Sequence, residues 1–202
     1  MTESLHGNVR HKSPVALLLL DVLNDLRFPK NKALVRQIPG LGRRLSALKR
    51  RCVAAGIPVL YANDNKGLWR SDAVTLLNHC LGSESLGRSL VRRILPGPDD
   101  YLVLKPKHSA FYASPLGTLL VYLKTKTLIL CGLTTDSCVL TTACDAFVRD
   151  LNLFIPADCI ASTEKSLQRD ALRILKKSLN ADVTVSSRLK LAQLLKLPAR
   201  FD

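Results

Sequence analysis

Three residues with reactive side chains follow apolar runs of the chain. Asp21 directly follows one such run, Lys105 directly follows a second, and Cys138 lies seven residues beyond the end of a third. A thiol beside an ammonium group and a carboxylate can act as a nucleophile, because the cation stabilises the thiolate and the carboxylate accepts the proton. Alone, each residue has a simpler interpretation: a turn cap, a surface lysine and a core thiol. Their occurrence together at strand ends favours a catalytic group.

The apolar runs alternate with amphipathic stretches along the whole chain. We expect strands at 15–20, 58–62, 101–104, 127–131, 152–156 and 182–185. We expect helices at 41–55, within 63–95, and at 116–123, 137–149, 165–178 and 187–195, with a loop that contains Pro29 and Pro39 before the first of them. This alternation predicts a three-layer α/β/α Rossmann-like fold with a mainly parallel six-stranded sheet. Ligands bind such sheets at the carboxyl ends of the strands, where Asp21, Lys105 and Cys138 are expected.

Cys138 is expected in the first turn of the helix at 137–149. Free N–H groups and the positive end of the helix dipole stabilise a thiolate there, and a neighbouring lysine does the same. The local setting therefore predicts a lowered pKa for the Cys138 thiol.

Length and composition indicate an ordinary globular domain. The chain has 202 residues, of which 47% are hydrophobic and 23% charged, and we expect a flexible segment at 1–13 and one domain at 14–202. No apolar run reaches the roughly 18 to 20 residues that span a bilayer, and 1–13 lacks the apolar segment of a secretory signal. The six cysteines form no CxxC pair, so we expect a cytoplasmic protein with reduced thiols.

The net charge of +14 favours a search for a polyanion partner. The first 101 residues carry 16 Lys and Arg and the last 101 carry 14, with eight acidic residues in each half, so the charge is spread over the chain. Aromatic residues are only 5% of the chain, which argues against a stacking surface for single strands. A nucleic-acid partner is therefore not expected, although a non-catalytic, nucleic-acid-associated protein is the alternative from another functional class.

Five segments resemble one family when they are taken in order. They are Leu20–Asp25, Val103–Tyr112, Cys131–Val139, Thr142–Ala146 and Pro156–Ala161. From Ala16 to about Ser162 the chain resembles the isochorismatase-like cysteine hydrolases, which include nicotinamidases and N-carbamoylsarcosine amidohydrolases.

The resemblance implies a role for each reactive residue. Cys138 matches the nucleophile, Asp21 the general base and Lys105 the lysine that bridges them, with Lys107 as a less favoured candidate. It also implies a cis peptide bond between Leu133 and Thr134, which would direct the N–H groups of Thr134 and Cys138 at one point as an oxyanion hole.

The chain departs from the family pattern in its pocket walls. Leu23 replaces a common glutamine, Leu26 a common aromatic residue, and His108 a frequent tyrosine. The segment Asn63–Arg70 contains no histidine, whereas nicotinamidases carry metal-binding histidines there, so we expect no metal and no other cofactor.

Four residues are candidate substrate contacts: Asn63, Trp69, Arg70 and Phe111. Trp69 could cover the substrate together with Phe111 and Tyr112, or pack in the core beneath its loop. Arg70 could bind a substrate carboxylate or lie on the surface.

These inferences predict hydrolysis of a C–N bond in a small amide or carbamoyl compound through a thioester on Cys138. An isochorismatase-type cleavage of a vinyl ether is the alternative within the family. A redox-sensing thiol is disfavoured, because Cys144 does not share a helix face with Cys138. The resemblance also implies a homo-oligomer, and no membrane association is expected.

Overall fold

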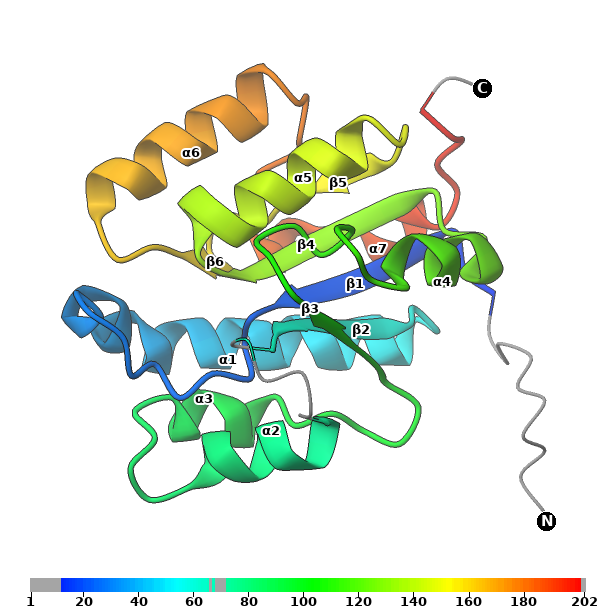
Figure 1. Cartoon of the computed structure of the whole chain (residues 1–202). Helices are drawn as coiled ribbons and strands as arrows, with labels where there is room; N and C mark the ends of the chain where they lie inside the picture. Colours follow the sequence, from blue (N-terminus) through cyan, green and yellow to red (C-terminus); the bar gives the residue numbers. More distant parts are fainter. Residues whose placement is uncertain (1–11, 66, 68–71, 201–202) are drawn as a thin grey trace, which may run out of the picture.

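The fold is built on one parallel sheet. The computed structural model describes residues 12–65, 67 and 72–200, and Figure 1 displays the arrangement of their elements. The sheet order is β3-β2-β1-β4-β5, with β6 paired to β4 beyond the end of β5, and every pair is parallel. The strands are β1 (Val15–Leu20), β2 (Val59–Asp64), β3 (Tyr101–Lys105), β4 (Thr127–Leu133), β5 (Asn152–Phe154) and β6 (Ile160–Ala161).

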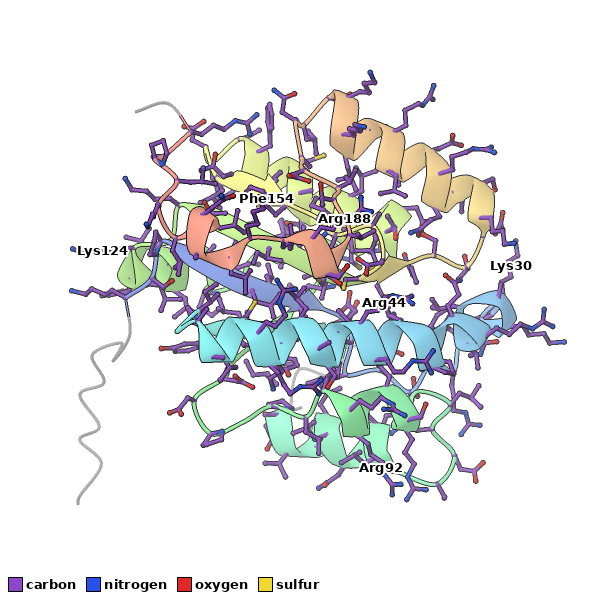
Figure 2. The ribbon with its side chains drawn as sticks, turned by 180° about the vertical axis from the view of Figure 1, so that it is seen from behind. Lys30, Arg44, Arg92, Lys124, Phe154 and Arg188 are labelled. Atoms are coloured by element: carbon purple, nitrogen blue, oxygen red, sulfur yellow. The ribbon has the colours of Figure 1, made fainter. Side chains whose placement is uncertain are left out.

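Helices cover both faces of the sheet. They are α1 (Lys32–Ala54), α2 (Ala73–Leu81), α3 (Arg88–Arg93), α4 (Leu116–Leu123), α5 (Leu140–Phe147), α6 (Lys165–Lys177) and α7 (Leu191–Leu194), with short helical turns η1 (Thr135–Val139) and η2 (Ser186–Arg188). Helices α1, α3 and α7 pack on one face and α4, α5 and α6 on the other. Figure 2 shows α1 and α7 side by side on the first face. None of the described helices combines the length and apolar character needed to cross a membrane.

Strand β1 lies at the centre of the sheet because it can be buried on both sides. All six of its residues are buried. Leu17 and Leu19 join the core on the α1 side, whereas Leu18 and Leu20 join the core on the α4 side. A continuous apolar run of this kind is typical of a parallel strand between two helix layers. The predicted α/β/α fold with a parallel six-stranded sheet is confirmed.

The sixth strand is β6, so the predicted strand at 182–185 is wrong. Asp182 forms only an isolated parallel bridge with Phe154. The N–H of Thr184 donates to the side chain of Asp182, and the carboxylate of Asp158 accepts hydrogen bonds from the backbone N–H and hydroxyl group of Ser186. These bonds end the extended segment and begin η2.

Helix α1 begins at Lys32 rather than at Leu41, so the predicted loop at Pro39 is wrong. An interior proline costs about 3 kcal/mol or more. Pro39 is exposed, while Leu34 and Ile38 are buried and continue the apolar stripe of the helix. Burial of two such side chains contributes about 1.5–3 kcal/mol each, which offsets the proline.

The predicted helix at 137–149 is divided into two parts. A π-helical turn, η1, comes first and contains Cys138, and α5 follows it. Single π turns often occur at functional sites. Cys138 is therefore in a wider turn than the first turn of a regular α-helix.

Gly132 allows β1 and β4 to approach closely at the edge of the sheet that carries Asp21. It pairs with Leu20 and has a φ of 122°. A Cβ atom at this position would lie 2.0 Å from the carbonyl oxygen of Leu20. The absence of a side chain at residue 132 thus sets the separation between the segments that carry Asp21 and Cys138.

We expect Gly132→Ala to lower the free energy of unfolding by at least about 1–3 kcal/mol, because the methyl group clashes and the backbone conformation is unfavourable. Urea denaturation followed by circular dichroism measures the change. Gly117→Ala in α4 is the matched control: its Cβ would meet its nearest neighbour at 3.9 Å, so stability should be unchanged or rise by up to about 1 kcal/mol. A Gly132→Ala protein as stable as the parent would contradict this account.

Candidate active site

Asp21, Lys105 and Cys138 lie together at the carboxyl edge of the sheet. Asp21 follows β1, with a φ of 49° and a hydrogen bond from its N–H to the carbonyl of Ala62. Lys105 is the last residue of β3, and Cys138 lies in η1 just beyond β4. A positive φ is uncommon for a residue with a side chain, although aspartate tolerates it better than most. The conformation of Asp21 is held by its neighbours.

The Lys105 ammonium group connects the other two side chains. Its Nζ lies 2.9 Å from Asp21 Oδ2 and 3.5 Å from Cys138 Sγ, and it donates to the carbonyl of Lys107 at 3.1 Å. The Lys105 side chain has no exposed surface. Asp21 Oδ1 accepts a hydrogen bond of 2.7 Å from the N–H of Asp64. Each polar atom of the buried ion pair therefore has a partner, as buried charges require.

Burial and pairing act in opposite directions on the two charges. Burial raises the pKa of Asp21 above its usual value, and Lys105 only partly offsets this effect. Burial alone would lower the pKa of Lys105, but the charge of the Asp21 carboxylate and its hydrogen bond with Lys105 raise it on balance. Lys105 is thus held as a cation, and the Asp21 carboxylate is a stronger base than an exposed one.

The predicted lowering of the Cys138 pKa is wrong. The pKa of the thiol is raised to about 12: burial is the largest cause, the Asp21 carboxylate adds to it, and Lys105 lowers the pKa only in part. The thiol is 9% exposed, so the loss of hydration outweighs the nearby ammonium group. Cys138 therefore rests as a thiol, and its proton has to pass to a neighbouring base when it reacts.

His108 also contacts the sulfur atom of Cys138. Its Nδ1 lies 3.8 Å from Cys138 Sγ, and the residue is exposed, unlike Asp21 and Lys105. The sequence identified His108 only as a change in the pocket wall. Its contact with the thiol depends on how the loop after β3 folds back, for which the sequence carries no signal.

The segment between β4 and Cys138 is fixed by side chains from distant positions. The peptide bond between Leu133 and Thr134 is cis. The hydroxyl of Thr135 donates to Gln168 Oε1 at 2.5 Å, and Ser162 donates to Asp136 Oδ1 at 2.6 Å. Sequence reasoning missed Gln168 and Ser162, because contacts with helix α6 and the end of β6 depend on tertiary packing.

The side chain of Asn63 forms hydrogen bonds with the backbone of Leu23, in the loop after Asp21. Its side-chain oxygen accepts from the N–H of Leu23 at 3.3 Å, and its side-chain nitrogen donates to the Leu23 carbonyl at 2.6 Å. The residue is buried. Asn63 thus ties β2 to the loop that follows Asp21, and its contact with substrate stays a prediction.

Phe111 packs in the core on the α4 side. Its ring is buried, with the guanidinium carbon of Arg149 4.6 Å from the ring centroid. Its contact with substrate also stays a prediction. Trp69 and Arg70 lie outside the described residues.

Within the described part of the chain, no group of three or more His, Cys, Asp or Glu side chains is placed to hold a metal ion.

We expect Lys105→Met to lower the free energy of unfolding by about 3–5 kcal/mol at neutral pH, because it leaves the Asp21 carboxylate buried without its cation. Urea denaturation measures the loss. The double variant Asp21→Asn/Lys105→Met should recover most of the stability, since neither charge is then left alone. A single variant that is no less stable than the double one would refute the importance of the pair.

Comparisons with known proteins identify the family of the chain. The family model described as "Isochorismatase domain" matches residues 15–187. The uncharacterized isochorismatase family protein YaaI of Bacillus subtilis is 33% identical over 178 residues, which are 88% of this chain and 97% of the relative.

Two solved structures share the fold. N-carbamoylsarcosine amidase of Thermoplasma acidophilum matches with a TM-score of 0.68 and 22% identity, over 87% of this chain and 98% of that one. Nicotinamidase PncA of Bacillus subtilis matches with a TM-score of 0.64 and 26% identity, over 85% and 99% of the two chains. From the family match, the shared fold and the long alignment with YaaI, we conclude that the chain belongs to the isochorismatase family of hydrolases.

Proposed function

We propose that the protein is a cysteine hydrolase that cleaves the C–N bond of a small amide or carbamoyl compound through a thioester on Cys138. The observation that carries this proposal is the position of the Lys105 ammonium group, 2.9 Å from the Asp21 carboxylate and 3.5 Å from the Cys138 sulfur. A thiol, a base and a fixed cation in contact are the components of nucleophilic catalysis.

The first step is proton transfer from the thiol. Because the pKa of Cys138 is raised to about 12, little thiolate exists before the substrate arrives. Asp21 accepts the proton as the sulfur attacks the carbonyl carbon, and Lys105 stabilises the charge that develops on sulfur. A base with a raised pKa suits this role, because a stronger base takes the proton more readily.

The tetrahedral intermediate needs donors for its oxygen atom. We assign this role to the backbone N–H groups of Thr134, which directly precedes η1, and of Cys138, which lies within it. Each such donor contributes about a hundredfold to a thousandfold in rate. Protonated Asp21 then returns its proton to the leaving nitrogen, the C–N bond breaks, and the thioester remains.

Water completes the cycle by attacking the thioester carbon. Asp21 accepts a proton from this water, and the collapse of the second tetrahedral intermediate expels the sulfur of Cys138, which recovers its proton. The net reaction is addition of one water molecule across the C–N bond, which gives an acid and an amine. No proton or electron is left over.

The burial of the thiol supports a small substrate. Cys138 is 9% exposed, and His108, which is exposed, contacts its sulfur. A substrate must therefore bring its carbonyl carbon past the imidazole to a nearly enclosed sulfur atom, which favours small compounds over a folded polypeptide.

Membership of the isochorismatase family makes vinyl ether cleavage the second candidate reaction. Cleavage of a vinyl ether, the reaction of isochorismatases, uses an acid and requires no covalent bond to sulfur. The contact between Lys105 and the thiol favours the amide reaction, because stabilisation of a thiolate serves only a reaction in which sulfur is the nucleophile.

We expect Cys138→Ala to reduce turnover of the true substrate by a factor on the order of 10⁴ to 10⁶. A screen over small amides, carbamoyl amines and isochorismate finds the substrate, and intact-protein mass spectrometry of rapidly quenched enzyme should detect the acyl group on Cys138. Cys144→Ala is the matched control, since Cys144 is an exposed thiol on the following helix, and it should keep full activity. Full turnover by Cys138→Ala would exclude the thioester mechanism, and full turnover of isochorismate by that variant would identify the vinyl ether reaction.

The pH dependence of kcat/KM should report Asp21. Burial raises its pKa above the usual 3.8, and the base works only when deprotonated, so activity should be present above this raised pKa and lost as the pH falls through it. Asp21→Asn should abolish activity, whereas Asp170→Asn on the exposed surface of α6 should leave the acid limb in place. An acid limb at or below the ordinary carboxyl pKa would contradict the assignment of Asp21 as base.

A further inference from the structure

We propose that α3 and the residues just before it form a binding site for a small phosphate-type anion, separate from the cysteine site. A cavity of about 440 Å³ lies here. It is lined by Ser85, Leu86, Arg88, Ser89, Arg92 and Arg93. Small-molecule sites commonly have volumes of about 300–1,000 Å³.

The lining consists almost entirely of hydrogen-bond donors and positive charge. Five of its six residues are arginines or serines, and no acidic residue is among them. Glu84, the nearest acid in the sequence, is exposed and does not line the cavity. Arg88 and Arg92 are four residues apart on α3, where like charges repel. An anion between these side chains would remove the repulsion.

The three guanidinium groups have no protein partner in the described part of the chain. Arg88, Arg92 and Arg93 form no hydrogen bond or ion pair with any described residue. Elsewhere in the described part, Arg44 contacts Asp158 and Arg149 pairs with Asp145, whereas Arg36, Arg43 and Arg173 likewise have no described partner for their guanidinium groups. What distinguishes Arg88, Arg92 and Arg93 is that all three line one cavity whose lining contains no acidic residue.

Two of the lining residues each carry a buried polar atom that no described residue satisfies. The hydroxyl oxygen of Ser85 and Nε of Arg88 are buried and have no hydrogen-bond partner. Buried polar groups are almost always satisfied, and exceptions in a folded protein call for a water molecule, an ion or a functional role. Both residues line the cavity, so an anion bound there would lie next to these two donors.

The backbone around the cavity is held in place. The N–H groups of Leu86 and Gly87 donate to the carbonyl of Asp25 at 3.0 and 3.2 Å. A side chain at Gly87 would meet the carbonyl oxygen of Asn24 at 1.8 Å, so the two segments are in close contact. Leu90 and Val91 anchor α3 in the core. The arginines therefore extend from a fixed support, and Figure 2 shows Arg92 at the edge of the molecule, on the side of α3 away from α1.

The chemistry of the donors selects the ligand class. The planar guanidinium group donates two parallel hydrogen bonds to a phosphate or a carboxylate. Three arginines without an acidic neighbour favour a ligand with at least two negative charges. Inorganic phosphate, pyrophosphate and small phosphate monoesters share this chemistry.

Calorimetric titration of the full chain at physiological ionic strength tests the site. The probes are inorganic phosphate, pyrophosphate and glycerol 3-phosphate. We expect saturable binding of one anion per chain. The probe that binds most tightly identifies the preferred form of the ligand: free phosphate, pyrophosphate or a phosphate monoester. Arg92→Gln and Arg88→Gln should each weaken binding at least about tenfold, as the loss of a charged hydrogen bond predicts.

Arg173→Gln is the matched control, because it removes one exposed arginine from α6 on the opposite face of the sheet. It should bind the anion as the parent does. Arg92 is exposed, so its variant should fold, and thermal denaturation followed by circular dichroism verifies folding of all three variants.

Three results would overturn the proposal. The first is no binding of any of the three probes, and the second is equal weakening by Arg173→Gln, which would mean general attraction to a basic protein. The third is binding of a single-stranded oligonucleotide that requires Arg92 while pyrophosphate does not bind, which would make this face a nucleic-acid surface. Because the measurement needs neither Cys138 nor turnover, its outcome is independent of the proposed hydrolase reaction.

Discussion

The ion pair between Lys105 and Asp21 is the interaction on which the arrangement of the site depends. The Lys105 ammonium group and the Asp21 carboxylate come from the ends of two different strands, and each is buried next to the other. Lys105 ends β3 and Asp21 follows β1, so they meet only because β2 lies between these strands and all three run parallel. A buried lysine without Asp21, or a buried aspartate without Lys105, would be strongly unfavourable. The sheet order and the charge pair therefore require one another.

The same pair sets the protonation of Cys138. The carboxylate raises the pKa of the thiol and the ammonium group lowers it, while burial acts in the direction of the carboxylate. The outcome is a neutral thiol with a base in contact with the same lysine. In the proposed mechanism Cys138 therefore stays protonated until the substrate arrives and forms a thiolate only during attack, unlike cysteine sites in which a stable thiolate is present before the substrate binds.

Much of the site could be predicted because its residues follow strands. The positions of Asp21, Lys105 and Cys138 after apolar runs were sufficient to place them at one edge of a parallel sheet. The pKa of Cys138 could not be predicted in the same way, because it depends on how deeply the thiol is buried. Gln168 and Ser162, which hold the turn before Cys138, also carry no local signal, since their partners Thr135 and Asp136 are distant in the sequence.

The fold was predictable where one strong local pattern decides the structure, and it was not where two patterns compete. The run at 15–20 is short and continuously apolar, which favours a buried strand, and the structure has β1 there. At Pro39 the helix-breaking residue and the apolar stripe of α1 make opposite predictions, and the stripe prevails because Leu34 and Ile38 are buried. At 182–185 the alternating residues favour a strand. The hydrogen bonds that Ser186 donates to the Asp158 carboxylate instead end the extended segment and begin η2.

The three contacts of the Lys105 nitrogen have a consequence for which side chains this position can accept. They reach an oxygen of Asp21, the sulfur of Cys138 and the carbonyl of Lys107, which belong to three separate segments. An ammonium group is tetrahedral and sends its protons in three directions from one atom, whereas a guanidinium group is flat and distributes its protons over three atoms in one plane. Arginine would preserve the charge but not this branching, so the position is selective for the shape of the cation as well as for its sign.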